Sequence, residues 1–122
     1  MATALLITTN DRFKVIDYEP GLDFLYKHIE TDIVQVVIPY GLQLASLDEK
    51  YIMIADEEAL LKDNPKFNIY ASTFHGSPVF GNVMILKTND EDFEGLEKED
   101  HNEIAAAIQK LLNELEQQYH GN

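Results

Sequence analysis

Two carboxylates and an aromatic side chain lie together in the stretch IDYEPGLDFLYKHIE, residues 16–30, directly before an amphipathic helical pattern. If this chain is extended, Asp17 and Glu19 point to the same side, because side chains alternate along a strand. A carboxylate pair of this kind could perform acid and base catalysis or bind a divalent cation. The same residues also fit the start of a helix, with Pro20 at its first position and Glu19 as its cap. We prefer the capping interpretation, which leaves only Asp17 and Tyr18 unexplained.

Other patterns that could carry chemistry are weaker. Thr73, His75 and Ser77 alternate in TFHGSP, but no G-x-S-x-G motif is present, and Gly76 and Pro78 indicate a turn. The four histidines lack the spacing of metal ligands, the six glycines form no phosphate-binding loop, and the chain has no cysteine. The sequence therefore predicts no catalytic residue, no metal and no cofactor, and we expect a protein that is not an enzyme.

The charge of the chain is unusual for its length. Nine Lys and Arg residues face 22 Asp and Glu residues, so the net charge is −13. This charge disfavours direct binding of nucleic acid or of an anionic membrane. The N-terminal residues do not resemble a signal peptide, and no apolar segment is long enough to span a membrane. With no cysteine to form disulfides, we expect a soluble cytoplasmic protein.

Much of this charge lies in the segment NDEDFEGLEKEDHNE, residues 89–103. Its acidic residues are Asp90, Glu91, Asp92, Glu94, Glu97, Glu99, Asp100 and Glu103. A solvated, charged surface is the simplest interpretation. Mimicry of DNA is an alternative, but eight acids less Lys98 give −7 where about 22 Å of duplex would carry roughly 13 charges. Acids elsewhere could extend the surface, namely Asp48, Glu49, Asp56, Glu57 and Glu58.

The order of the expected elements predicts an α+β fold. Strands are expected near residues 2–9, 12–18, 32–38, 50–55, 68–74 and 82–87, with LQLASL at 42–47 as a further candidate. Helical periodicity predicts two main helices, at about 20–30 and about 100–119. Because the strands mostly follow one another, we expect a mixed or antiparallel sheet with the helices packed on one face. At 122 residues the chain fits a single domain, residues 1–122.

Several of these segments together resemble the DUF3846 family, small proteins found largely in phages, plasmids and their bacterial hosts. The matching segments are IDYEPGLDFLYKHIETDIVQVV, YIMIADEEALLKDNPKFNIYAS and GNVMILKTND. The resemblance covers about residues 12–100 and implies a mobile-element context without implying an activity.

Three hypotheses about function follow. The first is a non-enzymatic accessory protein that binds a host or phage protein, basic in charge, through its acidic surface. The second is a partial DNA mimic that inhibits a nucleic-acid enzyme. The third is a small ligand-binding domain or enzyme in which Asp17, Glu19, Asn64 and Asn68 form one pocket. A homodimer is also compatible with the sequence, through the stripe of the last helix.

Two segments are polar, form turns and are not explained by core formation alone, which makes them candidate binding sites. The candidate residues are Tyr18, Glu19, Pro20, Asn64, Pro65 and Asn68.

Overall fold

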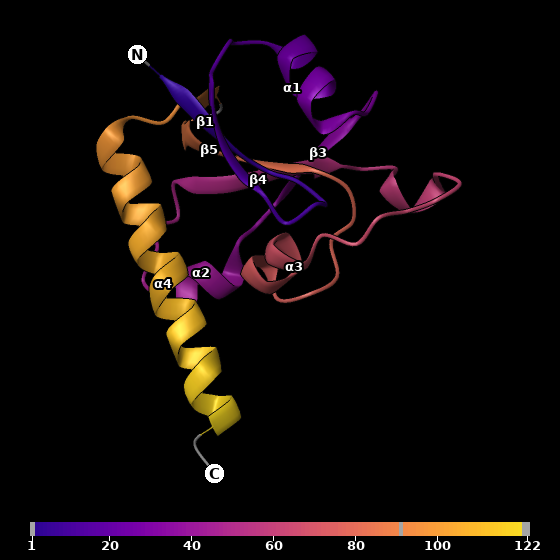
Figure 1. Cartoon of the computed structure of the whole chain (residues 1–122). Helices are drawn as coiled ribbons and strands as arrows, with labels where there is room; N and C mark the ends of the chain where they lie inside the picture. Colours follow the sequence, from indigo (N-terminus) through magenta and orange to yellow (C-terminus); the bar gives the residue numbers. More distant parts are fainter. Residues whose placement is uncertain (1, 91, 121–122) are drawn as a thin grey trace.

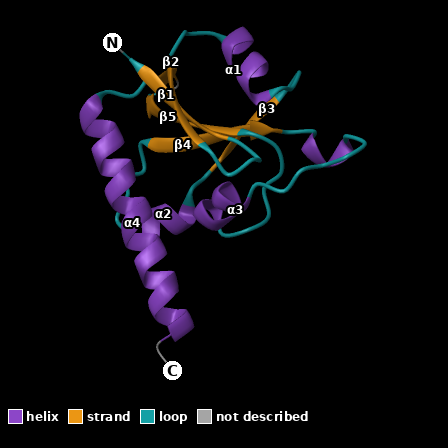
Figure 2. Ribbon diagram, in the orientation of Figure 1, coloured by secondary structure: helices purple, strands orange, loops and turns teal. Residues whose placement is uncertain are grey.

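The computed structural model describes residues 2–90 and 92–120, and its centre is one antiparallel sheet (Figures 1 and 2). Within these residues the strands run in the order β2-β1-β5-β4-β3, and β6 pairs with the end of β5. The strands are β1 (Thr3–Ile7), β2 (Phe13–Asp17), β3 (Val34–Val37), β4 (Tyr51–Asp56), β5 (Val83–Asn89) and β6 (Asp92–Glu94). Of the two sheet types predicted, the antiparallel one is confirmed.

The helices complete the predicted α+β fold. They are α1 (Leu22–Ile29), α2 (Tyr40–Leu44), α3 (Ile69–His75) and α4 (Lys98–His120), with a short 3-10 helix, η1 (Ala59–Leu61). The two main helices of the sequence prediction correspond to α1 and α4. The acidic segment, residues 89–103, contains β6 and the start of α4.

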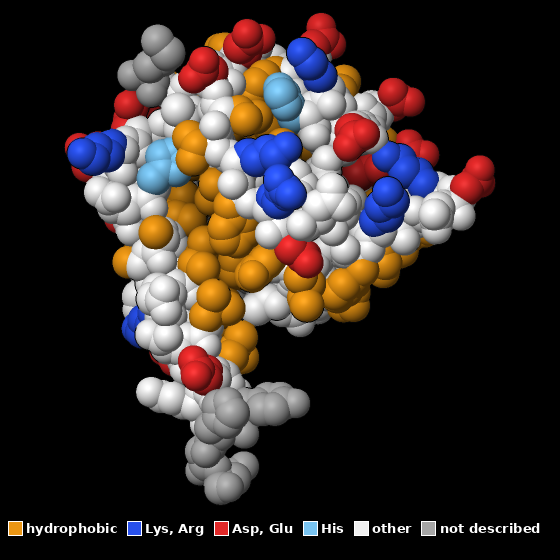
Figure 3. All heavy atoms as spheres, in the orientation of Figure 1, with side chains coloured by type: hydrophobic (Ala, Val, Ile, Leu, Met, Phe, Trp, Pro, Cys, Tyr) orange, Lys and Arg blue, Asp and Glu red, His pale blue; other side chains and the backbone are white. Residues whose placement is uncertain are grey.

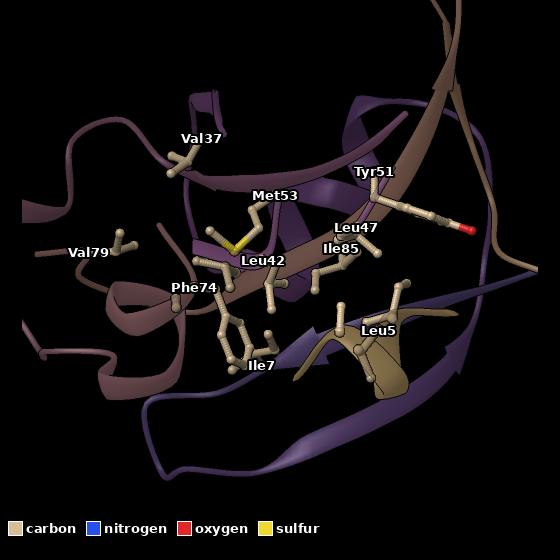
Figure 4. Packing of buried hydrophobic residues seen from close by; sticks show 14 of the residues in the cluster. Leu5, Ile7, Val37, Leu42, Leu47, Tyr51, Met53, Phe74, Val79 and Ile85 are labelled. Carbon is tan, nitrogen blue, oxygen red and sulfur yellow. The ribbon is translucent and has the colours of Figure 1, made fainter. Parts of the chain in front are cut away.

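The helices cover both faces of the sheet, so the prediction of helices on one face is wrong. Alternate residues of the central strands enter two separate cores, as Tyr51 and Met53 do on one side of β4 and Ile52 and Ile54 on the other. Helix α1 packs in the second core, whereas α2, α3 and α4 pack in the first (Figures 1 and 4). The unbroken apolar runs of β1, β4 and β5 were the signal of strands buried on both faces.

Two segments predicted as strands are helices. Residues 42–47 fall on and after α2, and residues 68–74 form most of α3. The aromatic and β-branched residues of NIYASTF suggested a strand, but its flanking residues are helix caps. Asn68 accepts a hydrogen bond from the Ala71 amide at 3.0 Å, and Gly76 ends α3 with φ of 94°. This cap pair at helical spacing was the overlooked signal.

The predicted cap of α1 is also wrong. The helix begins at Leu22, its N-cap is Gly21 with φ of 112°, and no side chain caps it. Glu19 and Pro20 therefore lie in the connection between β2 and α1. Their backbone connects the end of β2, an edge strand, to α1 on the second face of the sheet. This connection is the structural role of the segment.

Candidate functional site

Antiparallel pairing brings distant acidic segments to one end of the sheet. The end of β2, the start of β1, the end of β5 and the start of β4 all lie there, because each strand runs opposite to its neighbour. Thr3 pairs with Leu96 through hydrogen bonds of 2.9 and 2.6 Å, which attaches the segment leading into α4 to the same end. Thr88 donates to the Lys50 carbonyl at 2.8 Å, which places Asp48 and Glu49 beside the β5–β6 turn.

Tyr18 connects two candidate regions, residues 18–20 and the acidic segment 89–103. Its hydroxyl donates a long hydrogen bond, 3.4 Å, to the Phe93 carbonyl in β6, and its ring packs edge-on against Phe24 of α1 at 5.5 Å. Burial raises the pKa of Tyr18, and the negative charges of Asp92 and Glu94 raise it further. The predicted site at residues 18–20 therefore lies directly beside the acidic segment.

Gly95 allows this close approach. A Cβ atom at Gly95 would lie 2.6 Å from the Cβ of Ala2 and 2.9 Å from Cδ2 of Tyr18, distances that side chains do not adopt. The glycine that interrupts the acidic segment therefore lets β6 and the following turn pack flat against β1 and Tyr18.

Asp100 belongs to the interior, which corrects its assignment to the acidic surface. Its residue is 5% exposed, and its carboxylate accepts hydrogen bonds from the Glu97 amide and from Lys87 Nζ, both at 2.7 Å. The hydroxyl of Tyr51 donates to Asp100 Oδ1 at 2.7 Å and also lies 2.9 Å from Glu103 Oε2. Asp100, the third residue of α4, thus accepts from the amide of the residue before the helix, as in a capping box, and fixes the helix to β4 and β5.

The charge states of this cluster follow from its contacts. Burial alone would raise the pKa of Asp100, but the bonds from the Glu97 amide, Lys87 and Tyr51 outweigh burial and lower that pKa to about 2. Burial and the two neighbouring carboxylates raise the pKa of Tyr51 far above its usual value. Figure 4 shows the hydroxyl of Tyr51 turned away from the other labelled core side chains. The hydroxyl is a fixed hydrogen-bond donor.

The remaining acids of this region form a surface that we call the acidic end. Its members are Asp17, Glu19, Asp48, Glu49, Asp90, Asp92, Glu94, Glu97, Glu99 and Glu103. These ten carboxylates less Lys50 and Lys98 leave eight negative charges, because Lys87 is neutralised by Asp100. Glu91, predicted to belong to the same surface, lies outside the described residues. The acidic end thus carries eight of the 13 net negative charges of the chain.

The other predicted binding segment, Asn64 and Pro65, lies at the opposite end of the sheet. Both residues line a cavity of about 210 Å³ together with Asp56, Lys62 and residues from the end of α1 and the loop before β5. Asp56 follows Tyr51 by five residues along β4, so roughly 17 Å separate the two ends.

Asp56 and Lys62 hold this second region together. Lys62 Nζ lies 2.8 Å from Asp56 Oδ2 and donates to the Glu30 carbonyl at 2.5 Å. Burial alone would raise the pKa of Asp56, but Lys62, the Thr31 hydroxyl and the Glu58 amide together lower it. The pair attaches the chain after η1 to the end of α1. The pair lines the cavity and has no net charge of its own.

Asn68 is a structural residue and not an accessible binding residue. Its side chain is fully buried, and its Nδ2 donates to the Ile7 carbonyl at 3.1 Å and the Gly81 carbonyl at 2.9 Å. Asp17 and Glu19 line a different cavity, beside α1. The four residues of the third hypothesis are therefore placed in three separate environments, and the single pocket that it requires is not formed.

Two features are absent from the part of the chain that the structure describes. Within residues 2–90 and 92–120, no three His, Asp or Glu side chains are grouped closely enough to hold a metal ion. The helices of that same part of the chain are all too short or too polar to cross a bilayer.

Comparison with known proteins identifies the family. A family model described as a domain of unknown function, DUF3846, matches residues 1–113 of the 122-residue chain. The chain belongs to the DUF3846 family. No curated protein and no solved structure matches it. The DUF3846 match takes in every strand, both ends of the sheet and the first two thirds of α4, so the acidic end lies wholly within the family domain.

Proposed function

We propose that this DUF3846 protein is a non-enzymatic accessory protein that binds a basic host or phage protein through its acidic end. The charge distribution carries the proposal. Eight net negative charges occupy one end of the sheet, whereas the opposite end carries six acids, Glu30, Asp32, Asp56, Glu57, Glu58 and Asp63, against Lys62 and Lys66, a net charge of −4.

A charged surface of this kind attracts a partner during its approach and also contributes to its binding. Clustered charge of one sign attracts a partner of opposite sign over about a Debye length, roughly 10 Å at 0.1 M salt and about 3 Å at 1 M. The acidic side chains lie on segments that hydrogen bonds hold in place. These include the bonds between Thr3 and Leu96 and the bond from the Glu97 amide to Asp100 at the start of α4. A rigid array loses little conformational entropy when a partner binds.

The cellular context is part of the same proposal. We place the protein in the cytoplasm, in a cell that carries a phage or another mobile element. The absence of cysteine is compatible with a reducing compartment. The membership of the DUF3846 family supports the mobile-element origin.

Mimicry of DNA is the second candidate and shares the same surface. Of the acids that could have extended a DNA-like array, Asp48 and Glu49 join the acidic end. Asp56, Glu57 and Glu58 lie at the far end of β4, and Asp56 is buried in its pair with Lys62. The array is therefore short, which favours binding of a protein by charge over replacement of a length of duplex.

The test is a capture experiment with matched charge variants. The tagged protein is incubated with lysate of the host at about 50 mM and about 500 mM salt, and captured proteins are identified by mass spectrometry. One variant removes four charges from the acidic end, through Glu49→Gln, Asp90→Asn, Asp92→Asn and Glu99→Gln. The control variant removes four exposed charges elsewhere, through Asp32→Asn, Glu57→Gln, Glu58→Gln and Asp63→Asn.

We expect a basic protein that is captured at low salt by the wild type and the control variant, and that is lost at high salt and with the acidic-end variant. Equal loss in both variants would contradict the proposal, because net charge alone would then explain binding. Duplex DNA added to the low-salt complex separates the two candidates: displacement of the partner favours the mimic, and retention favours direct protein binding.

A further inference from the structure

Asp56 is a buried carboxylate that lies against open space. Its side chain is 1% exposed, yet the residue lines cavities of about 140, 290 and 210 Å³. Its Oδ1 accepts hydrogen bonds from the Thr31 hydroxyl at 2.6 Å and the Glu58 amide at 2.9 Å. Among the described residues, the partner of Oδ2 is the Lys62 ammonium at 2.8 Å, in an ion pair without hydrogen-bond geometry. A carboxylate oxygen can accept two hydrogen bonds, so Oδ2 has binding capacity that the chain does not use.

Lys62 is a partner that a ligand can replace. Its side chain is 49% exposed, and it lies in the irregular segment between η1 and α3. Together with Glu30 and Asp56, Lys62 lines both the 290 Å³ and the 210 Å³ cavity, so it lies between them. Rotation of this one side chain into solvent therefore joins the two cavities and uncovers Asp56 Oδ2.

The surroundings of Oδ2 favour a cation. The 290 Å³ cavity is lined by the carboxylates of Glu30, Asp32, Asp56 and Glu58 against the single ammonium of Lys62. Helix α1 ends at the same place, and the carbonyl of its C-cap, Glu30, accepts from Lys62 Nζ at 2.5 Å. The C-terminal end of a helix carries partial negative charge and stabilises a cation. The contacts of Asp56 keep its carboxylate ionised, although burial alone would raise its pKa.

The 210 Å³ cavity provides space for a short alkyl chain behind the cation. Its lining includes apolar side chains, those of Ile29, Ala59 and Pro65. Figure 3 shows acidic and basic side chains intermixed on the side of the molecule where η1 lies in Figures 1 and 2. Lys62 itself consists of four methylene groups that end in an ammonium, so its contacts show how a ligand of the same chemistry is held.

We propose that Asp56 and the end of α1 form a binding site for a small organic cation, an alkylguanidinium or a primary alkylammonium, which replaces Lys62. The cation lies between Asp56 Oδ2 and the Glu30 carbonyl, the two groups that Lys62 contacts. A guanidinium has five N–H donors in a planar fork, whereas an ammonium has three, so we expect the guanidinium to bind more tightly. The displaced Lys62 is hydrated in solvent, so no buried charge is left without a partner.

Isothermal titration calorimetry with butylguanidine tests the site, with butylamine and the uncharged isostere butylurea as comparisons. We expect one site per chain, weaker binding of butylamine and no binding of butylurea. Amide shifts in NMR spectra should be concentrated at residues 29–31, 56–62 and 81–82, and shifts confined to the acidic end would contradict the proposal. N-acetylarginine amide distinguishes two sources of the guanidinium. Tighter binding than butylguanidine assigns the site to an arginine of a protein, and weaker binding assigns it to a free small molecule.

Lys62→Met removes the internal competitor. The variant leaves Asp56 as a buried charge without a partner, so we expect a lower melting temperature that butylguanidine largely restores. Butylguanidine should also bind at least about tenfold more tightly than to the wild type, because a tethered lysine competes at an effective concentration in the millimolar range. Lys66→Met is the matched control. Lys66 lines the same cavity but is not the ion-pair partner of Asp56, so its loss should change both quantities much less.

The proposed function and this site are separately testable. The four-residue variant of the acidic end changes no residue that lines the cavities around Asp56, so it should bind butylguanidine as the wild type does. The basic protein partner should in turn be captured equally well by the wild type and by Lys62→Met. Failure of one proposal therefore leaves the other standing.

A double variant keeps the test valid if Lys62→Met does not fold. Asp56→Asn combined with Lys62→Met removes both charges together, so no buried charge is left unpaired. We expect a folded protein, as measured by circular dichroism, that has lost the binding of butylguanidine. Equal binding by the double variant and the wild type overturns the proposal. No saturable binding of butylguanidine by the wild type also overturns it.

Discussion

At the scale of single residues, buried polar groups of this protein are matched to specific partners. Asp100 illustrates this, because one carboxylate accepts from the Glu97 amide before α4, pairs with Lys87 and accepts from Tyr51. Its pKa of about 2 lies below its usual value of 3.8, so the folded state holds the ionised form more strongly than the unfolded state does. This carboxylate stabilises the fold above about pH 4, and the contribution, about 2 to 3 kcal/mol, is lost as the pH falls toward 2.

We therefore expect Asp100→Asn to lower the free energy of unfolding at pH 7 by about 2 to 3 kcal/mol, because the Lys87 charge loses its partner. Urea unfolding followed by circular dichroism measures the change. The variant should also lose part of the acid sensitivity of the wild type between pH 4 and 2. Its control is the neighbouring Glu99→Gln, an exposed site where we expect a change within about 0.5 kcal/mol. Equal stability of Asp100→Asn and the wild type at pH 7 would contradict this role.

At the scale of secondary structure elements, helix caps decide between strand and helix where side-chain preference is ambiguous. Asn68 caps the start of α3 and also donates to the carbonyls of Ile7, at the end of β1, and Gly81, before β5, so it fixes the helix against the sheet. At Gly41, a Cβ atom would lie 2.8 Å from the Thr73 carbonyl oxygen, which shows how closely α2 crosses α3. The Asn68 cap and the close approach at Gly41 both depend on backbone geometry, which a pattern of hydrophobic residues does not predict.

The two asparagines of the predicted binding segment should behave differently. Asn68→Ala removes a helix cap and its donor to the Ile7 and Gly81 carbonyls, the first of these bonds buried and the second partly buried, so we expect a loss of about 2 to 4 kcal/mol in the free energy of unfolding. Asn64→Ala changes an exposed residue at the cavity wall and should alter stability by less than about 0.5 kcal/mol. Thermal and urea unfolding of both variants give the comparison. Similar losses in the two would show that Asn68 has no special structural role.

At the scale of the whole molecule, the net charge of −13 determines the surface properties of the protein and also lowers the stability of the fold. Repulsion among the carboxylates of the acidic end opposes folding, since the unfolded chain can separate them. Raising the salt concentration from about 50 to about 500 mM at pH 7 should therefore increase the free energy of unfolding by roughly 1 kcal/mol. The four-residue variant of the acidic end should show a smaller increase. A salt-induced decrease would mean that attractive pairs dominate.

Much of the fold was predictable from local patterns. The α+β class, the strands β4 and β5, the long α4 and the family all follow from periodicity, turn residues and segment order. The predictions failed where a short segment could satisfy two structures, as in NIYASTF, or where the packing of both sheet faces mattered. The site was only partly predictable. Asp100 and Asn68 were candidate surface residues, but both are buried and have structural roles.

The sequence by itself determined the strong negative charge, the absence of cysteine chemistry and the periodicity of the main elements, because these properties are composition or depend on residues close in the chain. The tertiary structure decided which acids share a surface. Tyr18 and Phe93 meet because β1 lies between β2 and β5, an order that no local pattern specifies. The same strand order left β2 at an open edge and separated Asn64 from Glu19. Strand order results from the joint burial of both sheet faces, which is a property of the whole chain.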